Sequence, residues 1–94
     1  MSELSIADFE SRVDAVLPVL FTDGEVPLKL AAAEPLPGSP RVAGGFRLEF
    51  LGPLELFLPQ GIYSFALGDG EPTEIFIVPL GSAGEEMRYE AVFY

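Results

Sequence analysis

Turn-forming residues divide this chain into short apolar segments, and this pattern limits its fold more than any other feature of the sequence. The 94 residues include nine Pro and ten Gly, spread from Pro18 to Gly84. The dipeptide Asp-Gly occurs at residues 23–24 and 69–70, each time between apolar segments. Asp-Gly is typical of tight hairpin turns because its backbone readily takes positive φ values. Consecutive strands joined by such turns predict an antiparallel meander.

Six segments of the chain have the composition of β-strands: residues 17–21, 26–30, 46–50, 62–67, 75–78 and 87–94. In residues 46–50, apolar side chains alternate with charged ones, which predicts one buried face and one face in water. Residues 62–67 and 75–78 are apolar at almost every position, which predicts strands buried on both faces.

The connecting segments carry most of the Pro and Gly residues. Residues 34–45 contain three of each and predict the longest loop of the chain. Gly52-Pro53 predicts a break, after which residues 54–58 are expected to form a short edge strand or an extended connection. Residues 79–84 predict a further turn region.

The N-terminal segment has the pattern of a short helix over about residues 5–14. Ser5 is a suitable N-cap residue. Ile6, Phe9 and Val13 recur at spacings of three and four, which places them on one helical face. A helix of two to three turns is stable only when such a face docks on something larger.

These elements predict a mainly β fold that forms one domain over residues 1–94, with the meander over about residues 17–94. The chain is 49% hydrophobic and 12% aromatic, and it has no Cys, so packing alone must hold it together. A meander this apolar must close as a small barrel or fold into a two-layer sandwich to hide its faces. The helix is expected to plug one end or to cover one face.

The charge balance limits the partners that the protein can have. Fifteen acidic residues against five scattered basic ones give a formal charge of −10. Nucleic acid and anionic lipid both require clustered Lys and Arg, so neither is expected. A basic protein partner is compatible with this charge, although acidity also serves solubility alone. The sequence shows no signal peptide and no apolar run of the roughly 20 residues that a membrane span needs, which favours the cytoplasm.

Catalytic chemistry is restricted by the absence of His and Cys. Triads with a His base, thiolate nucleophiles and ordinary zinc sites all require these residues. A carboxylate pair needs a deep cleft, which a compact barrel of this size rarely supplies. Asp69, Glu71 and Glu74 cluster near one turn but lack the pattern of a calcium loop. The sequence therefore predicts no enzyme, no cofactor, no metal site and no catalytic residue.

Aromatic residues are the better indication of function. Some of the apolar side chains on the strand faces are expected to stay exposed, and a large exposed apolar patch marks an interaction site. A barrel that buries both faces is the alternative. The last strand also ends close to a sheet edge that could pair with a partner. The predicted partner-binding residues are Phe57, Tyr63, Phe65, Phe76 and Tyr94.

Several segments together resemble a family of small bacterial proteins of roughly 100 residues, described as a domain of unknown function. The most specific are Leu-Pro-Gln-Gly-x-Tyr at residues 58–63 and Tyr-Glu-Ala-Val-Phe at residues 89–93. The resemblance implies no catalytic residues, and it implies a genomic neighbourhood of phage-tail-collar-like proteins. Asp14 stands where the family pattern has Gly, and a His found after the equivalent of Tyr63 is missing.

The main functional expectation is a non-enzymatic structural or protein-binding accessory module, associated with phage-tail-like or tail-fibre proteins. Such a module could also form a homo-oligomer, and it could reside in an assembled extracellular particle. One alternative is a small-ligand-binding barrel, or an enzyme, that uses a barrel mouth near Gln60, Tyr63 and Tyr89. Another alternative is an acidic decoy that imitates nucleic acid.

Overall fold

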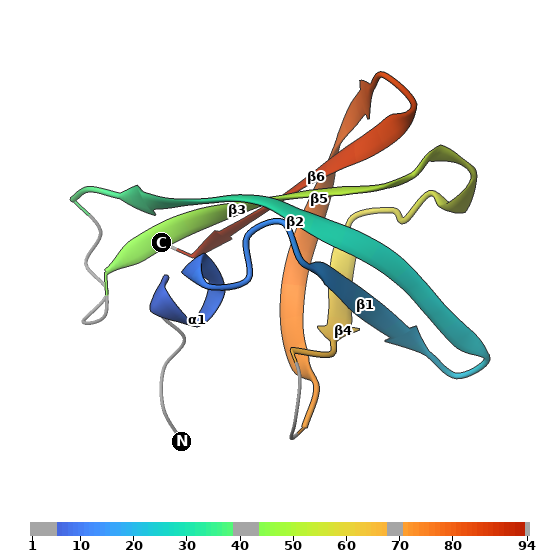
Figure 1. The fold of residues 1–94 in the computed structure, drawn as a ribbon, viewed down its shortest axis with the longest axis horizontal. Coiled ribbons are helices and arrows are strands. Elements are labelled where there is room, and N and C mark those ends of the chain that lie inside the picture. The colour runs from blue at the N-terminus through green and yellow to red at the C-terminus, as the bar shows by residue number, and fades with distance from the viewer. Residues whose placement is uncertain (1–5, 39–43, 68–70, 94) are drawn as a thin grey trace.

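The computed structural model describes residues 6–38, 44–67 and 71–93 (Figure 1). Its elements in chain order are α1 (Ala7–Glu10), β1 (Val16–Phe21), β2 (Gly24–Leu36), β3 (Gly45–Pro53), the 3₁₀ helix η1 (Leu54–Leu56), β4 (Gly61–Phe65), β5 (Thr73–Ala83) and β6 (Glu86–Phe93). All strand pairs are antiparallel and close in the order β1-β2-β3-β6-β5-β4. The mainly β fold is confirmed, and the closed ring selects the barrel over the sandwich.

Two long strands close the ring because each pairs with different neighbours along its length. The first part of β2 pairs with β1 and the rest pairs with β3, with an irregularity between Leu30 and Ala32. The first part of β5 pairs with β4 and the rest with β6, with an irregularity between Pro79 and Gly81. Such irregularities bend a strand and increase its twist, which lets a sheet curl onto itself.

The barrel interior is filled by apolar side chains from every strand and from α1. The prediction for β3 is confirmed, since Phe46, Leu48 and Phe50 are buried and their charged neighbours face outward. The buried set is Phe9, Leu17, Val19, Leu28, Leu30, Phe46, Leu48, Phe50, Leu58, Phe65, Ile75, Ile77, Tyr89 and Ala91.

The prediction that residues 62–67 and 75–78 are buried on both faces is wrong. On β5, Ile75 and Ile77 point into the core, but Phe76 between them is 49% exposed. On β4, Phe65 is fully buried, whereas Ile62 is 66% exposed. The ring has one interior, and α1 is too short to cover the outside of these two strands. Their outward apolar residues therefore remain at the surface.

The predicted loop over residues 34–45 is too long at both ends. Strand β2 continues to Leu36, where it pairs with Gly45 at the start of β3. Pro35 pairs with Phe46 in this part of the ladder. A proline fits there because this stretch of β2 has β3 as its only strand neighbour, so the missing N–H can face away from the ladder. Residues 39–43 lie outside the described residues.

Three other predicted boundaries are corrected by tertiary pairing. Gly52-Pro53 does not break the chain, because β3 continues through Pro53 opposite Glu86. Residues 54–58 form neither a strand nor a fully extended connection, since η1 occupies the first three of them. The predicted turn over residues 79–84 belongs mostly to β5, and the hairpin turns at residues 84–85.

The first predicted hairpin is confirmed, with its turn displaced by one residue. Phe21 pairs with Gly24, so Thr22 and Asp23 form the two-residue loop. The Asp69–Gly70 turn lies outside the described residues. The strands that it joins, β4 and β5, are paired as the prediction requires.

The N-terminal helix is confirmed as an element, but it is four residues long instead of about ten. Phe9 is fully buried, and its ring centroid lies 5.7 Å from that of Phe46 and 6.2 Å from that of Phe93. Val13 is 37% exposed, so it does not share the buried face that the spacing predicts. The predicted N-cap residue, Ser5, lies outside the described residues. The helix plugs one end of the barrel near the end of β6 (Figure 1).

Arg12 attaches this plug to the other side of the barrel end. Its guanidinium donates from Nε and Nη2 to the Leu67 carbonyl oxygen, at 3.1 and 2.7 Å. Leu67 follows β4, whereas Phe9 packs on residues of β3 and β6. The helical segment therefore spans the end of the ring from β6 to β4.

Asp14 gives a first prediction, because it is a non-glycine residue in the left-handed region, with φ of +75°. This conformation explains why a Gly is expected at this position from the sequence resemblance. Asp14→Gly should raise the free energy of unfolding by about 0.5–1 kcal/mol, because Gly adopts positive φ without steric cost. Asp14 lies 3.8 Å from Lys29, an exposed ion pair that contributes little.

Urea unfolding of the wild type, Asp14→Gly and Asp14→Asn tests this prediction. Asn tolerates positive φ as Asp does but lacks the charge, so Asp14→Asn controls for the loss of the ion pair. A destabilised Asp14→Gly beside an unchanged Asp14→Asn would contradict the prediction.

Candidate functional site

The outer β4–β5 face carries the most exposed apolar pair on adjacent strands. It is defined by the outward residues Ile62, Ser64, Glu74 and Phe76, which form two cross-strand pairs. Ile62 lies directly opposite Phe76, and the two side chains are 66% and 49% exposed. An exposed β-branched residue and an exposed aromatic residue that lie opposite each other form one continuous apolar patch, unlike apolar residues scattered singly over a surface.

The structure separates the five residues predicted to bind a partner. Phe76 lies on the outer β4–β5 face, and Phe57 is 51% exposed just after η1. Phe65 is fully buried, with its ring centroid 5.1 Å from that of Phe50, so it belongs to the core and cannot contact a partner. Tyr63 is half-buried. Tyr94 lies outside the described residues.

Ile62 is the residue of this face that sequence reasoning missed. Its segment reads as apolar throughout, so periodicity gave no sign of which side faces out. The pairing between strands shows which side faces out. Phe76 points outward because the isoleucines on either side of it are buried, and Ile62 lies directly opposite Phe76. Register between strands is therefore needed to find the pair.

The barrel mouth predicted around Gln60, Tyr63 and Tyr89 is occupied by the protein's own groups. Tyr89 is fully buried, and its hydroxyl oxygen accepts a hydrogen bond from the Leu58 N–H at 3.0 Å. Tyr63 donates its hydroxyl to the Pro59 carbonyl oxygen at 2.6 Å. Burial, with a smaller contribution from Tyr89, raises the pKa of Tyr63. Both tyrosine hydroxyls are therefore engaged with backbone groups of residues 58–59, whereas Gln60 is exposed.

The sheet edge predicted at the last strand is only partly open. Strand β6 pairs with β3 along its length and with β5 over Glu86–Glu90. Its last residues, 91–93, pair with β3 alone. The Phe9 ring of the plug lies beside Phe93 at this place, so the edge is next to a packed segment of the same chain.

A charged network covers the outer face of β2, β3 and β6. Arg47 donates to Glu90 Oε2 at 2.8 Å and also contacts Glu34 and Glu49. Arg88 donates to Glu49 Oε2 at 3.1 Å. The hydrogen bond to Glu34 is the largest of the contacts that raise the pKa of Arg47. These residues pair across strands, which indicates a structural role for the network.

Glu49 gives a pH prediction. The hydrogen bond from Arg88 is the largest cause that lowers the pKa of Glu49 below its ordinary value of 4.5. Its contribution to stability is therefore complete above pH 4.5 and is lost as pH falls through the lowered pKa of the folded state. Arg88→Met should move the pKa of Glu49 upward, so that stability depends less on pH below 4.5.

Carboxyl NMR titration and urea unfolding above and below pH 4.5 check this expectation. Lys29→Met is the matched control, because it removes one positive charge but leaves the contacts of Glu49 intact. An unchanged pKa of Glu49 in Arg88→Met would contradict the assigned cause.

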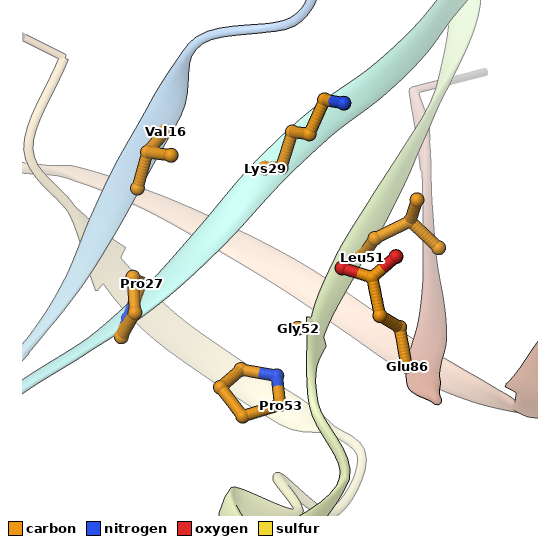
Figure 2. Close-up of a pocket in the computed structure, with 7 residues that line it drawn as sticks. All are labelled: Val16, Pro27, Lys29, Leu51, Gly52, Pro53 and Glu86. Carbon is orange, nitrogen blue, oxygen red and sulfur yellow. The ribbon is translucent and has the colours of Figure 1, made fainter. Parts of the chain in front are cut away.

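A shallow groove of about 290 Å³ lies on the outside of the ring, over β1, β2, β3 and β6 (Figure 2). Its lining is mostly apolar, with Lys29 on β2 and Glu86 on β6 as the charged members. The remaining lining residues are Val16, Pro27, Leu51, Gly52 and Pro53. This groove and the outer β4–β5 face are formed by different strands.

A scan against known protein families matches residues 4–93 to a domain of unknown function, DUF6916. The chain belongs to the DUF6916 family. The match covers all the described elements, so the closed six-stranded ring with its plug is the fold of this DUF6916 member. The expected membership of a domain family of unknown function is confirmed. Searches of curated proteins and of solved structures gave no match.

The described part of this DUF6916 domain has neither a metal-binding cluster nor a membrane-spanning helix. Residues 6–38, 44–67 and 71–93 contain no group of three or more acidic side chains placed to hold a metal ion. Within the same residues, neither of the helical segments has the length and apolar character needed to cross a membrane.

Proposed function

We propose that this DUF6916 domain is a non-enzymatic protein-binding module whose contact surface is the outer β4–β5 face. The observation that carries the proposal is the directly opposed pair of Ile62 and Phe76, exposed by 66% and 49% on adjacent strands. Aromatic and aliphatic side chains presented by rigid strands are the usual anchors of protein interfaces. Full burial of such a side chain is worth about 1.5–3 kcal/mol, and the exposed half to two thirds of these two side chains can contribute a corresponding part to a complex.

The charge of the domain supports a partner with a basic rim. Glu74 lies on the same face, two residues before Phe76, and forms none of the ion pairs found among the described residues. The formal charge of −10 attracts a basic protein and repels a second copy of this chain. A homo-oligomer is therefore the less favoured use of this face.

The packed interior supports a binding role over a barrel that encloses a ligand. The core residues of β3, β5 and β6 are apolar or aromatic and fully or almost fully buried, namely Phe46, Leu48, Phe50, Ile75, Ile77, Tyr89 and Ala91. The hydroxyl oxygen of the buried Tyr89 already accepts a hydrogen bond from the Leu58 N–H. A partner therefore meets this domain on the outside of the ring.

The sequence resemblance supplies a partner class for this proposal. Proteins like phage tail collars or tail fibres would be bound by the outer β4–β5 face. The module would then act in the cytoplasm during assembly, or within an assembled extracellular particle afterwards.

Affinity capture from the native host, with matched variants, tests the proposal. The tagged wild type is compared with Ile62→Glu and Phe76→Glu, which place a charge in the centre of the contact. Val13→Glu is the control, because Val13 is an exposed apolar residue away from this face. We expect a stoichiometric partner that Val13→Glu retains, and that each face variant binds at least about tenfold more weakly.

Two outcomes would contradict the proposal. One is a partner held equally by all four proteins, which would place the contact elsewhere. The other is no captured partner together with an unchanged monomeric mass in light scattering for every protein. A wild type that is oligomeric, and becomes monomeric in Ile62→Glu and Phe76→Glu, would assign the same face to self-association.

A further inference from the structure

The outer groove is built by two neighbouring rows of outward side chains. In one row, Val16 lies opposite Lys29, and Lys29 lies opposite Leu51 on the next strand. In the other row, Pro53 lies opposite Glu86. Figure 2 shows these residues around the groove, with Lys29 on β2 and Glu86 on β6, separated by β3. The floor is thus apolar, and its two charges lie on different sides.

The two charges of the groove are not equally available to a ligand. Lys29 already has Asp14 at 3.8 Å from its ammonium group. Glu86 is exposed and forms no ion pair within the part of the chain that the structure describes. Arg88, two residues from Glu86 on β6, is paired with Glu49 at 3.1 Å. The two ion pairs are each neutral, so the unpaired Glu86 leaves one negative charge beside the groove. This local balance favours a cationic group beside an apolar one.

The groove is of a size to hold one side chain of a partner, but not a whole small-molecule ligand. Sites that bury most of a small molecule have volumes of about 300–1,000 Å³. The groove has about 290 Å³ and is open to solvent, so it would cover only part of such a molecule. It is large enough for one anchor side chain of a larger partner. Anchors that fill a preformed apolar pocket dominate many protein interfaces.

We propose that this groove binds an extended peptide segment of a protein partner, through an apolar side chain that is followed by Lys or Arg. The apolar side chain lies on Val16, Leu51 and Pro53, and the neighbouring cation pairs with Glu86. The site uses other strands than the outer β4–β5 face, so the inference does not rest on the function proposed above. It gives the domain a second contact surface, with a stated preference for basic segments.

An NMR titration of the ¹⁵N-labelled full chain tests this inference. The probes are two capped tetrapeptides, Ala-Leu-Arg-Ala and Ala-Leu-Glu-Ala, which differ only in the charge beside the apolar residue. We expect the Arg peptide to shift the amides of Lys29, Leu51 and Glu86, with a Kd of about 1 mM. Glu86→Gln should weaken this binding by about two- to fivefold, the effect of an exposed ion pair.

Glu25→Gln is the matched control, because Glu25 is exposed in the β1–β2 hairpin and does not line the groove. It should bind the Arg peptide as the wild type does. Equal affinity for both peptides, an unchanged affinity in Glu86→Gln, or the absence of shifts would each overturn the inference. Shifts confined to Ile62 and Phe76 would also overturn it, and would at the same time support the outer β4–β5 face as the contact surface.

Discussion

Phe9→Ala should lower the free energy of unfolding by about 3–5 kcal/mol, the range for removing a fully buried phenylalanine. Phe9 is the only buried residue of α1, and it packs against Phe46 and Phe93. The stacked rings of Phe46 and Phe93, 4.5 Å apart, would lose their cover at the barrel end. Domains of this size have total stabilities of about 5–15 kcal/mol, so this change would remove a large part.

Val13→Ala is the control for this substitution, because the spacing of apolar residues predicts the same buried face for Val13 and Phe9. The structure leaves Val13 37% exposed, so Val13→Ala should change stability by less than about 0.5 kcal/mol. Urea unfolding followed by circular dichroism measures both. Similar losses in the two variants would contradict the different burial of Phe9 and Val13.

Gly52→Ala should destabilise the barrel by about 1–3 kcal/mol, because it overpacks a filled core. Gly52 lies in β3 with its Cα hydrogens toward the interior. A Cβ added there would lie 2.4 Å from Leu28 Cδ2 and 3.5 Å from Tyr89 Cε2. Leu28 and Tyr89 are both fully buried, so neither has free space into which it can move.

A double-mutant cycle separates this clash from a backbone effect of Gly52. Leu28→Val shortens the side chain that the new Cβ would meet. The loss in Gly52→Ala/Leu28→Val should therefore be smaller than the sum of the two single losses. Gly61→Ala is a control, because a Cβ at Gly61 would make only an ordinary contact, 3.7 Å from Tyr63. Additive losses in the cycle would contradict the steric explanation.

The sequence was sufficient for the fold class because the determining signals are local. Alternation in β3 and the Asp-Gly hairpin at residues 23–24 each specify a structure over a few residues, and both predictions hold. These signals left open a barrel or a two-layer sandwich, and a helix that plugs one end or covers one face. The barrel is decided by the β1–β4 and β3–β6 pairings, which join strands distant in sequence.

Element boundaries could not be predicted because partners distant in sequence set them. Pro35, Pro53 and Pro79 read as chain breaks, yet each lies in a strand held by its neighbour. The helix ends early for a comparable reason, since residues 14 and 15 exchange backbone hydrogen bonds with Leu30 of β2. At all these positions, hydrogen bonding to a strand distant in sequence outweighs the local preference of the backbone.

Only one residue of the exposed apolar pair was predicted from the sequence as a partner-binding residue. Phe76 was identified as an aromatic residue, but its neighbour Ile62 was assigned to a buried face. Exposure of that pair depends on how far a helix reaches over β4 and β5, and α1 has only four residues. The outer groove could not be inferred at all, because its lining comes from four strands that are brought together by the ring order.

The position of β6 in the ring has a consequence for how the protein is made. This strand is the last of the six to be synthesised, yet it lies between β3 and β5. Until it is added, the other five strands can pair only as one open sheet, in the order β3-β2-β1-β4-β5, with β3 and β5 as unpaired edges toward the vacant position. Such edges are templates for pairing with other chains. Productive folding therefore depends on the insertion of one eight-residue strand between two edges that are already formed.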